Sequence, residues 1–157
     1  MENNINEYKY LFNNEEKRTT IIKEFEQNLN TYILETESIW KETKTIEKGS
    51  NKFNEYSQKV LEELQKLNNE LRKMSESKSE SYKKDVDFLL NLERENYKIT
   101  LSIYLNKLKC FELLTNDEED FKLLQKEKEI ATMKSNLFSI REEINDFITN
   151  LKYKYLH

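Results

Sequence analysis

Most residue types that build active sites are scarce or absent in this chain of 157 residues. It has no proline, one glycine, one cysteine and a single histidine, His157, at the last position. A Ser-His-Asp or Cys-His catalytic set, a zinc site and a di-iron bundle all need more histidine or cysteine. A phosphate-binding loop needs more glycine. We therefore expect no enzymatic activity, no metal and no cofactor.

The single cysteine, Cys110, cannot form a disulfide within the chain, and a reducing compartment suits it. The first residues, MENNINEYKY, lack the basic start and apolar run of a signal peptide. Lys107 and Lys109 interrupt the most apolar stretch, LSIYLNKLKCFELL, so no membrane-spanning helix is expected there. We expect a soluble, intracellular protein that does not bind membranes.

Apolar residues are also scarce, and this predicts the fold class. Hydrophobic and charged residues each make up 36% of the chain, against roughly 45–50% and 25% in ordinary globular domains. Long helices that bury narrow stripes fit such a composition, and few helix breakers are present. The expected fold is all-α: an elongated antiparallel helical bundle or coiled coil of about four helices, in a single domain over residues 1–157. The net charge of −4 gives no basic footprint for DNA, so direct nucleic-acid binding is not favoured.

The first expected helix has an apolar seam that two charged residues interrupt. The seam consists of Leu11, Ile22, Phe25, Leu29 and Tyr32. Glu15 and Arg18 fill intervening seam positions, so we expect the start of this helix to be open and its later part to be packed. Ile39, Trp40 and Ile46 either extend the helix or form a looser segment. Gly49 suits a left-handed cap, followed by a turn at Gly49 and Ser50.

The second helix has the most regular spacing. Its seam alternates by four and three residues through Phe53, Ser57, Val60, Leu64, Leu67, Leu71 and Met74. The polar run SESKSES, residues 75–81, follows, and it predicts a loop at which the next helix turns back.

The third helix has two apolar seams and is the expected central helix. One seam contains Val86, Leu90, Tyr97, Leu101, Tyr104, Leu108 and Phe111, and the other contains Leu89, Leu92, Ile99, Ile103, Cys110 and Leu113. Asn96 and Asn106 lie within the second seam. They either fix the register as buried polar residues or lie at partly exposed positions, and we favour partial exposure.

The expected C-terminal helix covers residues 116–155. Thr115 and Glu118 have the spacing of a capping box at its start. A seam of three and four spacing follows through Ile130, Met133, Leu137, Ile140, Ile144, Phe147 and Leu151. This seam can pack along a hairpin or against another copy as a homodimer, and the sequence leaves both open.

Two groups of residues could bind partners. Lysines alternate with tyrosines at Tyr8, Lys9 and Tyr10 and again at Lys152, Tyr153, Lys154 and Tyr155. Such clusters can contact single-stranded nucleic acid, although packed tyrosines with snorkelling lysines explain them better. Trp40 could anchor a protein partner, or it could complete the local core, which we favour.

Several residues in order give the chain a resemblance to a known family. Arg18, Phe25 and Tyr32 with Ile33 come first, and Phe53, Ser57 and Val60 follow. The stretch NLERENYKIT then has Leu89 before it and contains Glu93, Glu95, Ile99 and Thr100. In this order and spacing the chain resembles the Required-for-Excision type B family of DNA-repair proteins over about residues 8–109. It departs from the family pattern at Leu90, Asn96 and Tyr97.

The resemblance implies a small helical protein needed for excision of DNA damage, with a nuclear location and the cytoplasm as the alternative, and it offers no catalytic residues to carry over. Glu93 and Glu95 would then form a polar ridge that binds a partner. The partners that the resemblance implies are proteins of the excision-repair machinery. By spacing, Glu93, Arg94, Glu95 and Lys98 face water. The expected function is a non-enzymatic adaptor that acts through protein contacts. The alternatives are a coiled-coil subunit of a cytoskeletal, trafficking or kinetochore-type complex, and a weak single-strand binder.

Overall fold

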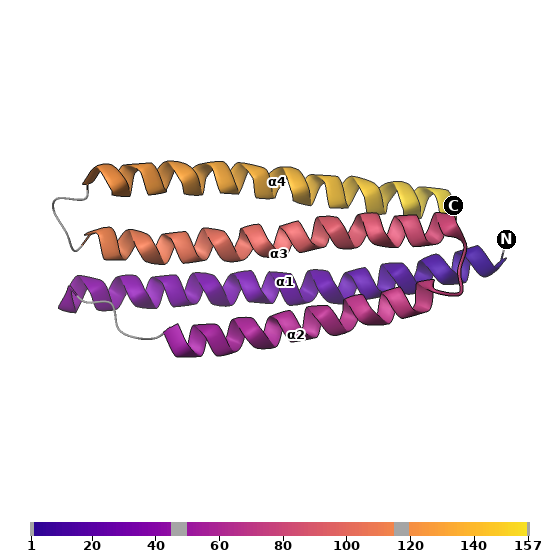
Figure 1. Ribbon diagram of the computed structural model, residues 1–157, viewed down its shortest axis with the longest axis horizontal. Coiled ribbons are helices and arrows are strands. Elements are labelled where there is room, and N and C mark those ends of the chain that lie inside the picture. Colours follow the sequence, from indigo (N-terminus) through magenta and orange to yellow (C-terminus); the bar gives the residue numbers. More distant parts are fainter. Residues whose placement is uncertain (1, 45–49, 115–119, 157) are drawn as a thin grey trace.

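The computed structural model describes residues 2–44, 50–114 and 120–156, and all its regular elements are helices. They are α1 (Glu2–Thr43), α2 (Ser50–Ser75), α3 (Glu80–Leu114) and α4 (Asp120–Leu156). The four helices lie along one direction and alternate in sense, so the two ends of the chain lie at the same end of an elongated molecule (Figure 1). The predicted all-α, elongated, antiparallel bundle is confirmed.

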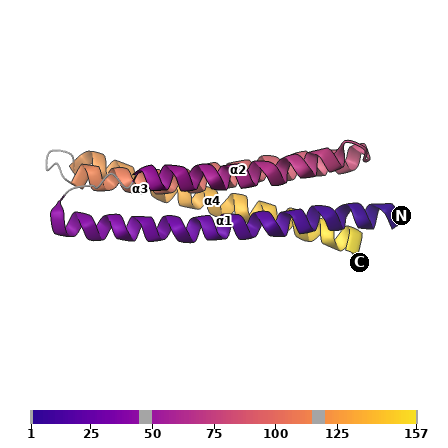
Figure 2. The same cartoon turned by 90° about the horizontal axis from the view of Figure 1, so that it is seen from below.

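Two helices, α1 and α3, form the middle of the bundle. Helix α3 contacts each of the other three helices, and so does α1. In the described part of the chain, α2 and α4 make no contact with each other. Figures 1 and 2 show α2 and α4 on different sides of the α1 and α3 pair. The prediction of α3 as the central helix is confirmed, and α1 shares that position.

The predicted seams supply the core. In α2 the buried side chains include Phe53, Val60, Leu64, Leu67 and Leu71, whereas Met74 at the end of the seam is exposed. They pack against α1 and α3. The seam of α4 packs within the chain, because Ile130, Leu137, Ile144 and Leu151 are buried. Cys110 lies half-buried at the margin of the α3 and α4 cluster.

The expectation of an open start to α1 was wrong. Tyr8, Leu11 and Phe12 are buried there, in one cluster with residues from α2, α3 and α4. Glu15 and Arg18 are buried as well. Charged residues at seam positions were interpreted as solvent-facing, but Arg18 pairs with Glu15 on its own helix and with Asn68 of α2. The helix continues through Trp40 to Thr43, and Ile46 and Gly49 lie outside the described residues.

The loop predicted at residues 75–81 is confirmed. It covers residues 76–79, so it begins one residue later and ends two residues earlier than predicted. Helix α2 ends at Ser75, and the Ser75 hydroxyl donates to the Arg72 carbonyl at 2.7 Å. The Ser79 hydroxyl accepts from the Tyr82 amide at 3.3 Å, which is the geometry of a helix N-cap. The capping box expected at Thr115 and Glu118 lies outside the described residues.

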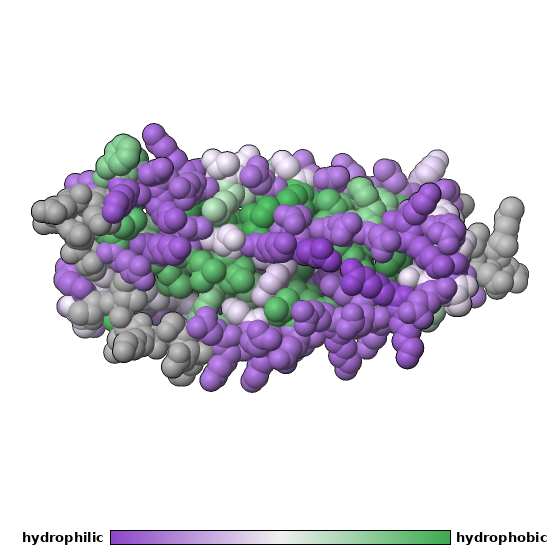
Figure 3. Space-filling model, viewed as in Figure 1, coloured by the Kyte–Doolittle hydropathy of each residue, from purple (hydrophilic) through white to green (hydrophobic). Residues whose placement is uncertain are grey.

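The face shown in Figure 3 is largely hydrophilic, and apolar side chains reach it in a broken band along the molecule. None of the helices, over the residues that the structure describes, is both long and apolar enough to cross a membrane.

A buried leucine on α3 and an exposed leucine on α1 can be compared to test how much the core contributes to stability. Leu89 is fully buried, whereas 65% of Leu34 is exposed. We expect Leu89→Ala to lower the free energy of unfolding by about 2–5 kcal/mol, because it leaves a cavity. The same change at Leu34 should alter it by less than about 0.5 kcal/mol. Urea unfolding followed by circular dichroism measures both, and equal effects would contradict the described burial.

Candidate functional site

A layer of polar side chains crosses the bundle, with a buried arginine at its centre. Arg18 of α1 has 1% of its surface exposed. Its guanidinium donates to Glu15 Oε2 at 2.7 Å, to Asn14 Oδ1 at 2.6 Å and to Asn68 Oδ1 at 2.9 and 3.0 Å. Asn14 also donates to the Leu67 carbonyl at 3.0 Å. Because burial of a charge is costly unless it is paired, these contacts hold α1 and α2 in one register.

Glu93 of α3 meets Glu15 in this layer, and both carboxyl groups are buried. Two buried carboxyls in contact strongly disfavour the doubly charged state. Burial and the neighbouring Glu93 raise the pKa of Glu15 well above its ordinary value, although Arg18 opposes the shift. Both effects favour the protonated form of the Glu15 carboxyl in the folded chain. Glu15 Oε1 is buried and has no hydrogen-bond partner among the described residues, and the neighbouring carboxyl group of Glu93 brings α3 next to α1 at this point.

The layer continues from Glu93 to α4. Asn96 Nδ2 donates to Glu93 Oε2 at 3.4 Å, and Asn96 Oδ1 accepts from Arg141 Nε at 3.0 Å. The Arg141 guanidinium also donates to Thr100 Oγ1 at 3.2 Å and forms an ion pair with Glu26 at 3.1 Å. All four helices therefore contribute to one polar layer.

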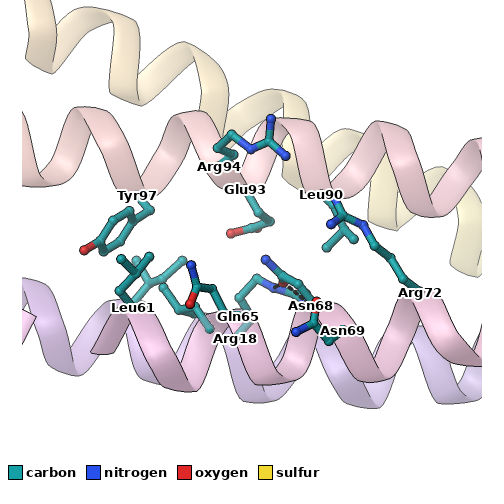
Figure 4. A pocket seen from close by; sticks show the side chains of 12 residues that line it. Arg18, Leu61, Gln65, Asn68, Asn69, Arg72, Leu90, Glu93, Arg94 and Tyr97 are labelled. Carbon is teal, nitrogen blue, oxygen red and sulfur yellow. Dashed lines mark hydrogen bonds between the residues drawn. The ribbon is translucent and has the colours of Figure 1, made fainter. Parts of the chain in front are cut away.

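A cleft of about 340 Å³ opens between α2 and α3 over this layer (Figure 4). Its lining consists of Arg18 and Ile22 from α1, Leu61, Leu64, Gln65, Asn68, Asn69 and Arg72 from α2, and Leu90, Glu93, Arg94 and Tyr97 from α3. In Figure 4, Glu93 points from α3 into the cleft and faces the amide side chains of α2. Burial raises the pKa of Tyr97, which keeps its hydroxyl neutral.

Two exposed arginines, Arg72 and Arg94, line opposite walls of the cleft. Among the described residues, no carboxylate lies within ion-pair distance of either guanidinium. An arginine binds a carboxylate or a phosphate with two parallel hydrogen bonds. The amides of Gln65, Asn68 and Asn69 can pair with peptide groups. The lining of this cleft contains no histidine, cysteine or serine.

A second cleft of about 290 Å³ lies on the other side of Glu93, between α1, α3 and α4. Arg141, Asn96 and Glu26 are among its lining residues. The chain has only four arginines against 22 lysines. All four of these arginines line one of the two clefts that share Glu93.

Glu93 and Glu95, which the family resemblance placed on one polar ridge, lie on different sides of α3. The expectation that Glu93 faces water was wrong, because it lies on the buried side of α3 between Leu89 and Asn96. Glu95 is exposed and pairs with Lys98 at 3.9 Å, as a solvated helix face does. Arg94 and Lys98 are exposed as expected. Glu93 and Glu95 therefore do not form one ridge.

The two asparagines of α3 also differ from each other. Asn96 is buried in the polar layer, so the preference for partial exposure was wrong for it. Asn106 is partly exposed, as favoured, and its side chain donates to the Ser102 carbonyl at 2.8 Å.

Trp40 lies apart from the cleft, near the end of α1. It is half-buried, and its ring packs against Phe111 of α3 at 6.5 Å between centroids. The Lys44 ammonium lies 4.1 Å from the centre of the ring. The interpretation that Trp40 completes the local core fits these contacts.

The two lysine and tyrosine clusters meet at the end of the bundle that holds both chain ends. Tyr8 and Tyr155 stack with centroids 3.8 Å apart, and the Tyr8 hydroxyl donates to Asp85 Oδ2 at 2.5 Å. Lys152 lies over the Phe12 ring at 5.6 Å and Lys154 over the Tyr155 ring at 5.2 Å. Tyr10 is partly buried, while Lys9 and Tyr153 are exposed. Most of these tyrosines are thus used in packing.

Sequence reasoning missed most of the cleft. Arg72, Arg94 and Asn68 were not identified, and neither was Arg141. The available signal was the rarity of arginine in a lysine-rich chain, since arginine is the residue suited to buried and bidentate pairing. In the described residues, no three His, Cys, Asp or Glu side chains gather in a way that could hold a metal.

The Glu15 carboxyl predicts a measurable pH dependence. A carboxyl with a raised folded pKa loses its proton on unfolding, so stability falls as pH rises above its ordinary pKa of 4.5 towards the folded value. The expected slope is up to about 1.4 kcal/mol per pH unit. Glu15→Gln should flatten this slope, because the amide donates to Glu93 and accepts from Arg18 at every pH.

Urea unfolding at several pH values between 5 and 8 provides the measurement. Glu16→Gln, at an exposed neighbouring position, is the matched control and should keep the wild-type slope. An unchanged slope in the Glu15 variant would show that this carboxyl is charged in the folded chain.

No family model, curated protein or solved structure matches this chain. The resemblance to the Required-for-Excision type B family stays a prediction.

Proposed function

We propose that this protein is a non-enzymatic helical adaptor that binds an acidic segment of a protein partner during excision of DNA damage. The observation that carries the proposal is the position of the few arginines. The chain has 22 lysines and only four arginines, and all four lie around Glu93 in the two clefts. Arginine at such positions suits bidentate recognition of a carboxylate.

The cleft between α2 and α3 fits a short segment better than a small apolar ligand. Arg72 and Arg94 offer two guanidinium groups at its walls, while Gln65 and Asn69 offer amides. Asp or Glu side chains of a partner would pair with the arginines, and the amides would bind its backbone. Leu61 and Leu64 add apolar contact beside these polar groups.

The repair process comes from the family resemblance. Two residues that carry it, Arg18 and Glu93, line this cleft, and Phe25 packs against Tyr97 at its edge with centroids 5.6 Å apart. The resemblance and the cleft therefore coincide in the same part of the molecule. The coiled-coil alternative relied on the seam from Ile130 to Leu151, which packs against α3 and α1 in this chain.

Removal of ultraviolet photoproducts tests the process and the cleft together. Cells that lack the protein should remove photoproducts slowly, and the wild-type chain should restore the normal rate. The double variant Arg72→Glu with Arg94→Glu should fail to restore it, because the reversed charges repel an acidic segment. Both residues are exposed, so the variant should fold, as circular dichroism will verify.

The matched control reverses two exposed lysines outside the cleft, Lys17→Glu with Lys84→Glu, and should restore the normal rate. Normal removal in cells without the protein would overturn the repair assignment. If cells without the protein remove photoproducts slowly and the cleft variant restores the normal rate, the repair assignment stands and the role of the cleft is overturned.

A further inference from the structure

Helix α4 has a second apolar face, which points away from the bundle. Phe121, Leu124, Phe138, Tyr153 and Leu156 are among the exposed large hydrophobic residues of the described chain. At about 100° per residue, all five lie within roughly 100° of helix surface, opposite the buried seam. The exposed fractions of the aromatic side chains are 77%, 62% and 77% for Phe121, Phe138 and Tyr153.

A helix with two apolar faces usually touches neighbours on both sides. The inner face of α4 is covered by α3 and α1, and in the described chain α2 makes no contact with α4. Helix α4 therefore lies at the edge of the bundle with its outer face exposed (Figure 1). Exposed apolar groups of this kind mark contact surfaces.

The outer face has a symmetric spacing. Phe121 and Leu124 lie near one end of α4, and Tyr153 and Leu156 lie near the other, each pair three residues apart. Phe138 lies midway between the two pairs. If a second α4 runs antiparallel about this midpoint, Phe121 faces Leu156 of the other copy, Leu124 faces Tyr153, and the two Phe138 rings meet. The pattern is therefore complementary to itself.

We propose that a second copy of this chain packs antiparallel on the outer face of α4, with Phe138 at the two-fold axis. Such an interface is isologous, since the same surface is used by both copies. It goes beyond the adaptor function, because it involves neither cleft.

The polar positions of the outer face allow this pairing. In the antiparallel register Glu142 lies opposite Ser135, Lys128 opposite Thr149 and Ala131 opposite Asp146, and all of these residues are exposed. No like charges oppose each other, and small residues let the two helices approach between the aromatic rings.

The surface area that two copies would bury against each other is also sufficient for association. With about 200 Å² for a whole aromatic side chain, the three rings alone expose about 430 Å² in each copy. The two leucines and the neighbouring small residues bring a pair of copies close to the roughly 1,200 Å² at which stable interfaces begin.

Sedimentation equilibrium of the full chain over a range of micromolar concentrations tests the dimer. The wild type should pass from monomer to dimer, and Phe138→Asp should weaken the association at least about tenfold, since the charge lies at the centre of the interface. Leu34→Asp, on an exposed part of α1, is the matched control and should associate like the wild type. A wild type that stays monomeric, or a Phe138 variant that dimerises equally well, would overturn the proposal.

Spin labels determine the register. Lys128→Cys, Ser139→Cys and Thr149→Cys are made singly in a Cys110→Ser background, and the distance between the two labels of each dimer is measured. The two-fold antiparallel pairing predicts about 30 Å of axial separation for positions 128 and 149, at about 1.5 Å per residue, and a short distance for position 139. Short distances at all three positions would indicate a parallel pair and exclude this interface.

Discussion

The buried guanidinium of Arg18 is the constraint on which the arrangement of α1, α2 and α3 depends. A cation taken out of water must find its hydrogen-bond partners inside the protein. Arg18 finds them in Asn14, Glu15 and Asn68, and Glu15 in turn lies beside Glu93 of α3. The apolar seams would tolerate a shift of one helix along another, whereas these paired groups would not. Hydrophobic spacing thus brings the helices together, and the polar layer fixes their register.

The charges of this layer favour a protonated Glu15. Glu15 and Glu93 would otherwise oppose a single Arg18, and one uncompensated negative charge would remain in the core. On the other side, Arg141 is matched by Glu26. Glu93 lines both clefts, so a charged ligand in either one would act on the same carboxyl pair.

The sequence predicted what depends on local spacing and missed what depends on pairing between helices. The seams of α2 and α4 and the polar loop before α3 followed from residue periodicity. Glu15, Arg18 and Glu93 were interpreted as solvent-facing, because a charge at a seam position is costly without a partner. Asn14 and Glu15 lie within about one helical turn of Arg18, but Asn68 on α2 is 50 positions away and Glu93 on α3 is further still. No periodicity within α1 could identify these two.

The stacking of Tyr8 on Tyr155 has a consequence for synthesis of the chain. These rings are 147 positions apart, yet both belong to one core cluster. At about 5–20 residues per second, a ribosome adds Tyr155 roughly 7–30 s after Tyr8. During that interval the start of α1 lacks its last neighbour, and Phe12 with it. The start of α1 can pack on α2 and α3 as soon as these helices are made, but the face of Tyr8 and Phe12 that α4 covers stays open until the last helix of the bundle is complete.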